Sequence, residues 1–91
     1  MTYRLFWEPH FTRRARSFLR KHPELQAPFD RLLDDLRSEP FPERIRVHAL
    51  GGHLDGLHSA RLTRSYRVVF RLRNDAKLLD LVDVGSHDDM Y

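Results

Sequence analysis

Hydrophobic residues alternate with polar ones at the start of the chain and then take up a helical period. Tyr3, Leu5 and Trp7 fall on one face of a short strand predicted over residues 3–7. Pro9 ends this strand, and Thr12 is placed to cap a helix. The hydrophobic positions of that helix repeat at i, i+4, i+7, i+8 and i+11, which predicts one buried stripe. They are Phe11, Ala15, Phe18, Leu19 and His22.

A second helix follows with the same spacing. Pro23 suits its first turn, where the missing N–H costs nothing. The two stripes predict a hairpin of helices that Pro40 and Pro42 bring to an end. The hydrophobic positions of the second helix are Leu25, Phe29, Leu32, Leu33 and Leu36.

The second half of the chain has strand patterns. Residues 43–56 are predicted as a loop, and strands over 57–63 and 66–72 are predicted to pair across a tight turn at Arg64 and Ser65. Residues 77–84 are apolar on both faces, as in a central strand. A strand, two helices and a three-stranded meander predict a single α+β domain over residues 1–91, with an antiparallel sheet and both helices on one face.

Composition excludes several classes of protein. Ninety-one residues suffice for one small core, and 41% hydrophobic residues argue against disorder. The chain has no apolar run of membrane-spanning length and no signal-peptide pattern. It has no cysteine, so a disulfide framework and a thiolate metal site are excluded, and a cytoplasmic location is expected.

Charge indicates a polyanionic partner. The net charge is +3 and the isoelectric point is about 9.8. Arginine, whose planar fork suits phosphate, makes up fourteen of the sixteen basic residues, although a GC-rich coding bias would give the same count. Their positions are more informative, because residues 57–73 contain five arginines and no acid. Strand alternation puts some of these on the outer face, where they form either an RNA-binding surface or an ordinary solvated face. The five are Arg61, Arg64, Arg67, Arg71 and Arg73.

Six histidines are many for this length. His48, His53 and His58 recur every five residues, which matches no common zinc spacing, so no metal or other cofactor is predicted. A histidine acting as general acid or base is a better interpretation, because its ordinary pKa lies near neutrality. For His53 and His58 a plain surface position is the simpler interpretation.

The C-terminal segment concentrates reactive side chains. His87 follows the predicted central strand and a strand-breaking Gly85, and Tyr91 could stack on a base or orient a phosphate. A histidine beside arginines suits RNA cleavage by the 2′-hydroxyl. A base removes the proton of the 2′-hydroxyl, arginines balance the charge on the phosphorane, and an acid protonates the leaving 5′-oxygen.

Two segments carry a resemblance to a known family. "ARLTRSYRVVFRL" (residues 60–72) and "LLDLVDVGSHDDMY" (residues 78–91) resemble the RelE/ParE superfamily of bacterial toxin–antitoxin toxins, and within it the YafQ- and YoeB-like mRNA interferases. "HALGGHLDGLHSARL" (residues 48–62) is similar to the segment before their first meander strand. The resemblance implies a microbial endoribonuclease that cuts mRNA at the ribosome and is neutralised by an antitoxin protein.

The resemblance also implies a set of site residues. His48 matches the family's loop histidine, His87 the C-terminal catalytic histidine, and Tyr91 the terminal aromatic position. Arg61 and Arg67 fall on strands where relatives place phosphate-contacting or catalytic residues. YafQ-type toxins carry a histidine and an aspartate where this chain has Arg61 and Ser65, so the division of acid and base between the two histidines stays open.

Two alternative functions remain at this point. The first is a non-catalytic toxin of the same fold, such as a ParE-like inhibitor of DNA gyrase. The second is a module that only binds nucleic acid. A pure binder has no use for a proton-transfer residue, so His87 favours the nuclease.

Overall fold

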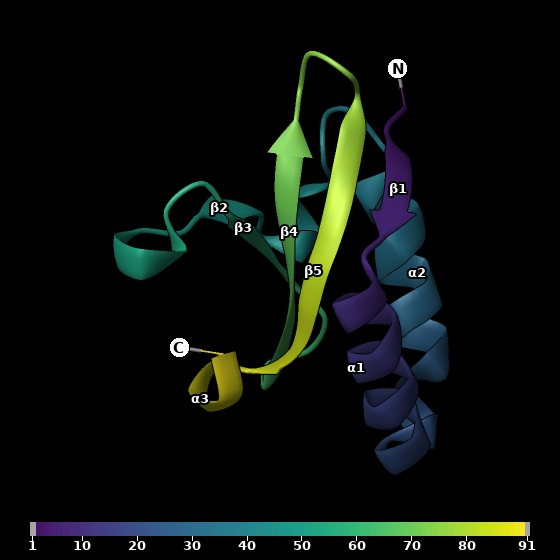
Figure 1. Cartoon of the computed structure of the whole chain (residues 1–91). Coiled ribbons are helices and arrows are strands. Elements are labelled where there is room, and N and C mark those ends of the chain that lie inside the picture. Colours follow the sequence, from purple (N-terminus) through teal and green to yellow (C-terminus); the bar gives the residue numbers. More distant parts are fainter. Residues whose placement is uncertain (1, 91) are drawn as a thin grey trace.

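Two helices cover one side of a five-stranded sheet (Figure 1). The computed structural model describes residues 2–90, so the predicted site residue Tyr91 lies outside the described residues. The strands are β1 (Arg4–Trp7), β2 (His48–Ala49), β3 (His58–Arg61), β4 (Tyr66–Arg73) and β5 (Leu78–Ser86). The helices are α1 (Pro9–Lys21), α2 (Gln26–Leu36) and the short α3 (His87–Met90). Single 3₁₀ turns occupy Pro23–Leu25, Glu43–Ile45 and Gly52–Leu54.

The strand order is β1-β5-β4-β3-β2. The β3–β4–β5 meander and the short β2 pair antiparallel, as predicted for the second half of the chain. β1 instead runs parallel to β5, with Leu5 opposite Leu79, so the complete sheet is mixed. The α+β class with both helices on one face is confirmed, whereas a strand of four residues carries no signal for the direction in which it pairs.

Helix α1 begins earlier than its predicted cap. Pro9 occupies the first turn and Glu8 is the N-cap residue, because the fixed φ of proline favours helix initiation. Thr12 lies inside the helix, where its Oγ1 donates to the Glu8 carbonyl at 3.3 Å. The expectation that Thr12 caps the helix is therefore wrong. α1 has 13 residues, and no helix within residues 2–90 is long and apolar enough to span a membrane.

The predicted helical stripes form the core. Phe11 and Ala15 from α1 and Phe29 from α2 are buried, and the Phe11 and Phe29 rings stack with centroids 6.2 Å apart. The remaining buried hydrophobic positions of α2 are Leu32, Leu33 and Leu36, as the pattern indicates, and the polar Asp35 is buried beside them. From the sheet, the core receives Ala60, Val68, Phe70, Leu79, Leu81 and Val84.

Three details of the strands differ from the predictions. The stretch predicted as a loop contains β2, and β3 ends at Arg61 rather than Thr63. A register shift between Val69 and Phe70 interrupts the simple alternation of β4. Gly85 does not break its strand, because β5 continues through it to Ser86. A glycine favours a break only when nothing pairs with it, and here Gly85 is paired with Arg67.

The core makes a direct prediction about stability. Phe11→Ala removes a fully buried ring and should lower the free energy of unfolding by about 3 to 5 kcal/mol, since the helices cannot close the cavity completely. Phe6→Ala is the matched control, because 51% of Phe6 is already exposed, and its effect should stay near about 0.5 kcal/mol. Urea unfolding at neutral pH measures both. Equal losses in the two variants would contradict this assignment of the core.

Candidate functional site

The sheet register brings several predicted site residues to one face. His48 of β2 lies opposite Ser59 of β3, and Ser59 lies opposite Val69 of β4. The next row on that face, two residues along, holds Arg61 opposite Arg67. The intervening row, Ala60 and Val68, points into the core. Successive residues of a strand point to opposite faces, so both rows lie on the face away from the helices.

The imidazole of His48 is held from both sides. Its Nδ1 lies 3.2 Å from the Arg46 carbonyl oxygen, and its Nε2 lies 3.5 Å from Oγ of Ser59. A carbonyl oxygen only accepts hydrogen bonds, so Nδ1 carries the proton in this contact. In the neutral ring, Nε2 then keeps its lone pair and accepts from the Ser59 hydroxyl. His48 is exposed to solvent while Ser59 is fully buried, so a buried hydroxyl and a backbone carbonyl fix the orientation of an exposed ring.

The arginines of this face fall into two groups. Nε of Arg73 lies 2.8 Å from the buried carboxylate of Asp80, and Nη1 of Arg71 lies 3.6 Å from Oε2 of Glu8. These acids come from other strands and loops, so the acid-free stretch in the sequence does not give a face of one sign. Within residues 2–90, the other three of the five arginines in the segment 57–73 make no ion pair with an acid. They are Arg61, Arg64 and Arg67.

His87 lies where β5 leaves the sheet. Gly85, which is buried, is opposite Arg67 and adds no side chain beside it. His87 begins α3 two residues later and is exposed. Figure 1 shows α3 and β2 on the side of the sheet away from α1 and α2. The structure therefore places His48, Arg61, Arg67 and His87 on the same side, whereas Arg64 lies in the exposed β3–β4 connection.

Two features of this region were missed at the level of sequence. Ser59, the buried hydroxyl that holds His48, carries no signal of its own because a lone serine in a strand is ordinary. The acid-free α1 is a second basic element, which its sequence "PHFTRRARSFLRK" could have revealed. Among residues 2–90, no group of three or more histidine or acidic side chains is arranged to hold a metal ion.

His58 is the histidine most affected by its surroundings. Its ring stacks on Phe70 with centroids 5.8 Å apart, and its buried Nδ1 has no hydrogen-bond partner within the described part of the chain. Burial, followed by the nearby His48, lowers the pKa of His58 below its ordinary value. His58 thus favours the neutral form and belongs to the packing beneath β2 rather than to an exposed surface.

Comparison with known proteins identifies the fold. No family model and no curated protein matches the sequence. The fold is that of the RelE/ParE toxins of bacterial toxin–antitoxin systems, as the resemblance implied. At identities of 20% or below, this likeness establishes the fold.

Three solved structures illustrate the match. YafQ from E. coli superposes with a TM-score of 0.82 at 16% identity, over 98% of both chains. YafQ in the E. coli DinJ–YafQ toxin–antitoxin complex gives 0.80 at 17% identity, over 100% of this chain and 99% of that one. A YoeB/ParE toxin from Agrobacterium tumefaciens gives 0.76 at 20% identity, over 92% of this chain and 98% of that one.

The lowered pKa of His58 predicts a pH dependence of folding. The unfolded chain protonates His58 near its ordinary pKa of about 6.5, whereas the folded protein resists protonation until lower pH. The free energy of unfolding is therefore undiminished by His58 above a pH of about 6.5, and it falls as the pH drops below that value. Between pH 7.5 and 5.5, His58→Phe should lessen the fall in the urea midpoint, while the exposed His53→Gln should leave it unchanged. Identical slopes in wild type and both variants would show that His58 does not control this window.

Proposed function

We propose that the protein is the toxin of a type II toxin–antitoxin system and a metal-independent endoribonuclease that cleaves mRNA at the ribosome. One observation carries this proposal. The exposed His48 and His87 lie on the same side of the sheet as Arg61 and Arg67, which make no ion pair with an acid within residues 2–90. These are the groups that transfer protons and balance phosphate charge during RNA cleavage.

The reaction follows from the roles of these groups. Nε2 of His48 takes the proton from a ribose 2′-hydroxyl, and the 2′-oxygen attacks the adjacent phosphorus. Arg61 and Arg67 stabilise the additional negative charge on the phosphorane. The bond to the 5′-oxygen then breaks, and protonated His87 donates its proton to that leaving oxygen. The products are a 2′,3′-cyclic phosphate and a 5′-hydroxyl, and no cofactor enters the step.

Bond geometry supports giving the base role to His48. Its Nδ1–H is engaged by the Arg46 carbonyl, so the free lone pair is on Nε2. The Ser59 hydroxyl at 3.5 Å orients the ring. His87, the remaining histidine of this side, is then the acid. Tyr91 keeps its predicted role of stacking on a base next to the cut.

The expected partners are mRNA, the ribosome and a cognate antitoxin. Similarity to YafQ as it occurs in the DinJ–YafQ complex supports an antitoxin. An acidic segment would complement the unpaired arginines and cover the site. A cytoplasmic location, where both mRNA and antitoxin are made, belongs to the same proposal.

Primer extension on a reporter mRNA in a translating extract tests the activity. Wild type should cut, and His87→Gln should reduce cutting by about 10² to 10⁴-fold because glutamine cannot donate the proton. Arg67→Ala should cost about 10² to 10³-fold through loss of charge stabilisation. His53→Gln and Arg37→Ala are matched controls, since both residues are exposed and lie outside the proposed site, and both should cut like wild type.

The alternatives make different predictions in the same assay. A gyrase-inhibiting toxin of this fold would leave the mRNA intact, and the wild type and the His87→Gln variant would arrest growth equally. A plain nucleic-acid-binding module would bind RNA without cutting it. Cuts by wild type that persist in both His87→Gln and Arg67→Ala would overturn the assignment of the site.

A further inference from the structure

Helix α1 carries a second concentration of positive charge. It has five arginine and lysine residues and no acid between Pro9 and Lys21. Of these five, Arg14 pairs with Asp83 at 2.9 Å, and within residues 2–90 the others make no ion pair. The unpaired ones are Arg13, Arg16, Arg20 and Lys21. A surface of unpaired cations attracts a polyanion.

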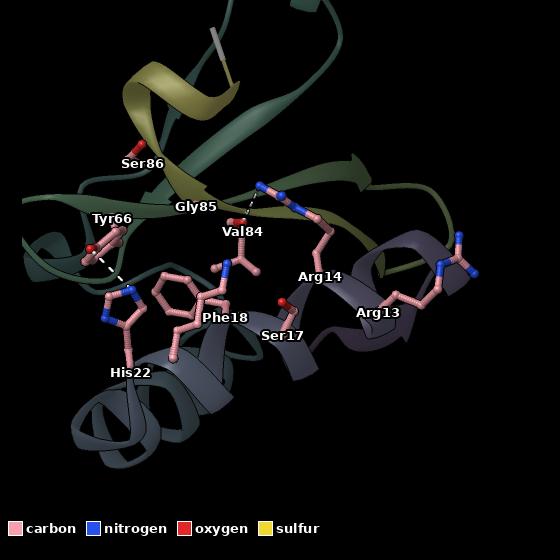
Figure 2. A pocket seen from close by; sticks show the side chains of 10 residues that line it. Arg13, Arg14, Ser17, Phe18, His22, Tyr66, Val84, Gly85 and Ser86 are labelled. Atoms are coloured by element: carbon pink, nitrogen blue, oxygen red, sulfur yellow. Dashed lines mark hydrogen bonds between the residues drawn. The ribbon is translucent and has the colours of Figure 1, made fainter.

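A groove runs between this helix and the ends of β4 and β5 (Figure 2). Its volume is about 330 Å³. One wall consists of two lines of residues spaced by four, from α1 and its C-cap residue His22. The other wall consists of Tyr66, Val84, Gly85 and Ser86. The first line is Arg13, Ser17 and Lys21, and the second is Arg14, Phe18 and His22.

The second line, Arg14, Phe18 and His22, is held in place by contacts with the strands across the groove. Nε of Arg14 donates to Asp83, and Nη2 of Arg14 donates to the Val84 carbonyl at 3.2 Å. Farther along, Nε2 of His22 lies 3.5 Å from the Tyr66 hydroxyl, and the Phe18 and Tyr66 rings meet edge to face at 4.9 Å. This wall is therefore formed before any ligand binds, which reduces the entropic cost of binding.

The first line supplies the positive charge that is free to bind a ligand. Arg13 and Lys21 are exposed and unpaired, and two turns of helix separate them by about 12 Å, with the Ser17 hydroxyl between. Asp83, next to the groove residue Val84, is paired with Arg14, and Glu24 lies 3.6 Å from Nδ1 of His22. Two separated cations with a hydroxyl between them suit successive phosphates of one strand better than a single small anion.

The groove and the proposed catalytic face meet at the end of β5. Strand β1 ends with Trp7 opposite Leu81, so β5 beyond Leu81 has no strand on that edge. Gly85 and Ser86 line the groove on the helix side, and Gly85 pairs with Arg67 on the other strand. A strand of RNA on the catalytic face can cross this narrow edge, where Gly85 presents no side chain, and reach the groove.

We propose that the groove between α1 and β5 binds phosphates of the same single-stranded RNA that is cut on the opposite side of the sheet. This inference rests on the proposed function for the identity of the strand. Arg13 and Lys21 contact its phosphates, Ser17 donates a hydrogen bond between them, and the fixed Arg14–Asp83 pair shapes the wall. The groove thereby contributes affinity for RNA away from the reacting bond.

Fluorescence anisotropy with a labelled, uncleavable 2′-O-methyl RNA dodecamer tests the proposal on the full chain. The variant Arg13→Gln/Lys21→Gln should bind at least about tenfold more weakly than wild type. Its salt dependence should also be shallower by about 1.4 in log–log slope, since two phosphate contacts are lost. The matched control is Arg16→Gln/Arg20→Gln, which removes the same charge from exposed positions of the same helix outside the groove and should bind nearly like wild type.

Each other outcome overturns the proposal in a recognisable way. Equal losses in the two double variants would mean that diffuse helix charge, rather than the groove, attracts RNA. Two RNA strands per wild-type protein and one per groove variant would mean that the groove holds a separate strand. Because the probe cannot be cut, these results are independent of cleavage, and a failure of the proposed nuclease activity appears only in the mRNA assay. Unchanged thermal midpoints confirm that all variants are folded.

Discussion

The antiparallel pairing of β4 with β5 is the constraint on which the rest of the structure depends. One side of this ribbon supplies Val68, Phe70 and Leu81 to the core beneath the helices. The other side places Arg67 opposite Gly85 and carries the chain on to His87. β3 and β1 add to its two edges, so both the proposed catalytic face and the α1 groove take their positions from the same register.

Charge pairing decides which basic residues remain available. Asp80 and Glu8 engage Arg73 and Arg71 near β1, and Asp83 engages Arg14 at the edge of β5. Among residues 2–90, the basic residues without an ion pair include Arg61, Arg64 and Arg67 around the other end of β4 and four residues of α1. A small domain with a net charge of only +3 thus keeps unpaired positive charge beside both the proposed site and the α1 groove.

Much of this arrangement follows from the sequence, and the reasons for the exceptions are physical. Periods of 3.6 and 2 identify α1, α2 and β4, because burial of one face imposes them on the residues. A run that is apolar on both faces identifies β5 as a central strand. The two residues of β2 and the parallel direction of β1 depend on tertiary pairing that leaves no local pattern. His48 and His87 stand out by residue type, whereas the support from Ser59 and the neutralising Asp80 depend on contacts between distant elements.

We propose that His48 and His87 cleave RNA through its own 2′-hydroxyl. Mass spectrometry of the ends of an mRNA cut by the wild-type protein tests this mechanism most directly. We expect a 2′,3′-cyclic phosphate, or the 3′-phosphate formed by its hydrolysis, on one fragment and a 5′-hydroxyl on the other. A 3′-hydroxyl with a 5′-phosphate would contradict it, because those ends arise when water, and not the ribose, attacks the phosphorus.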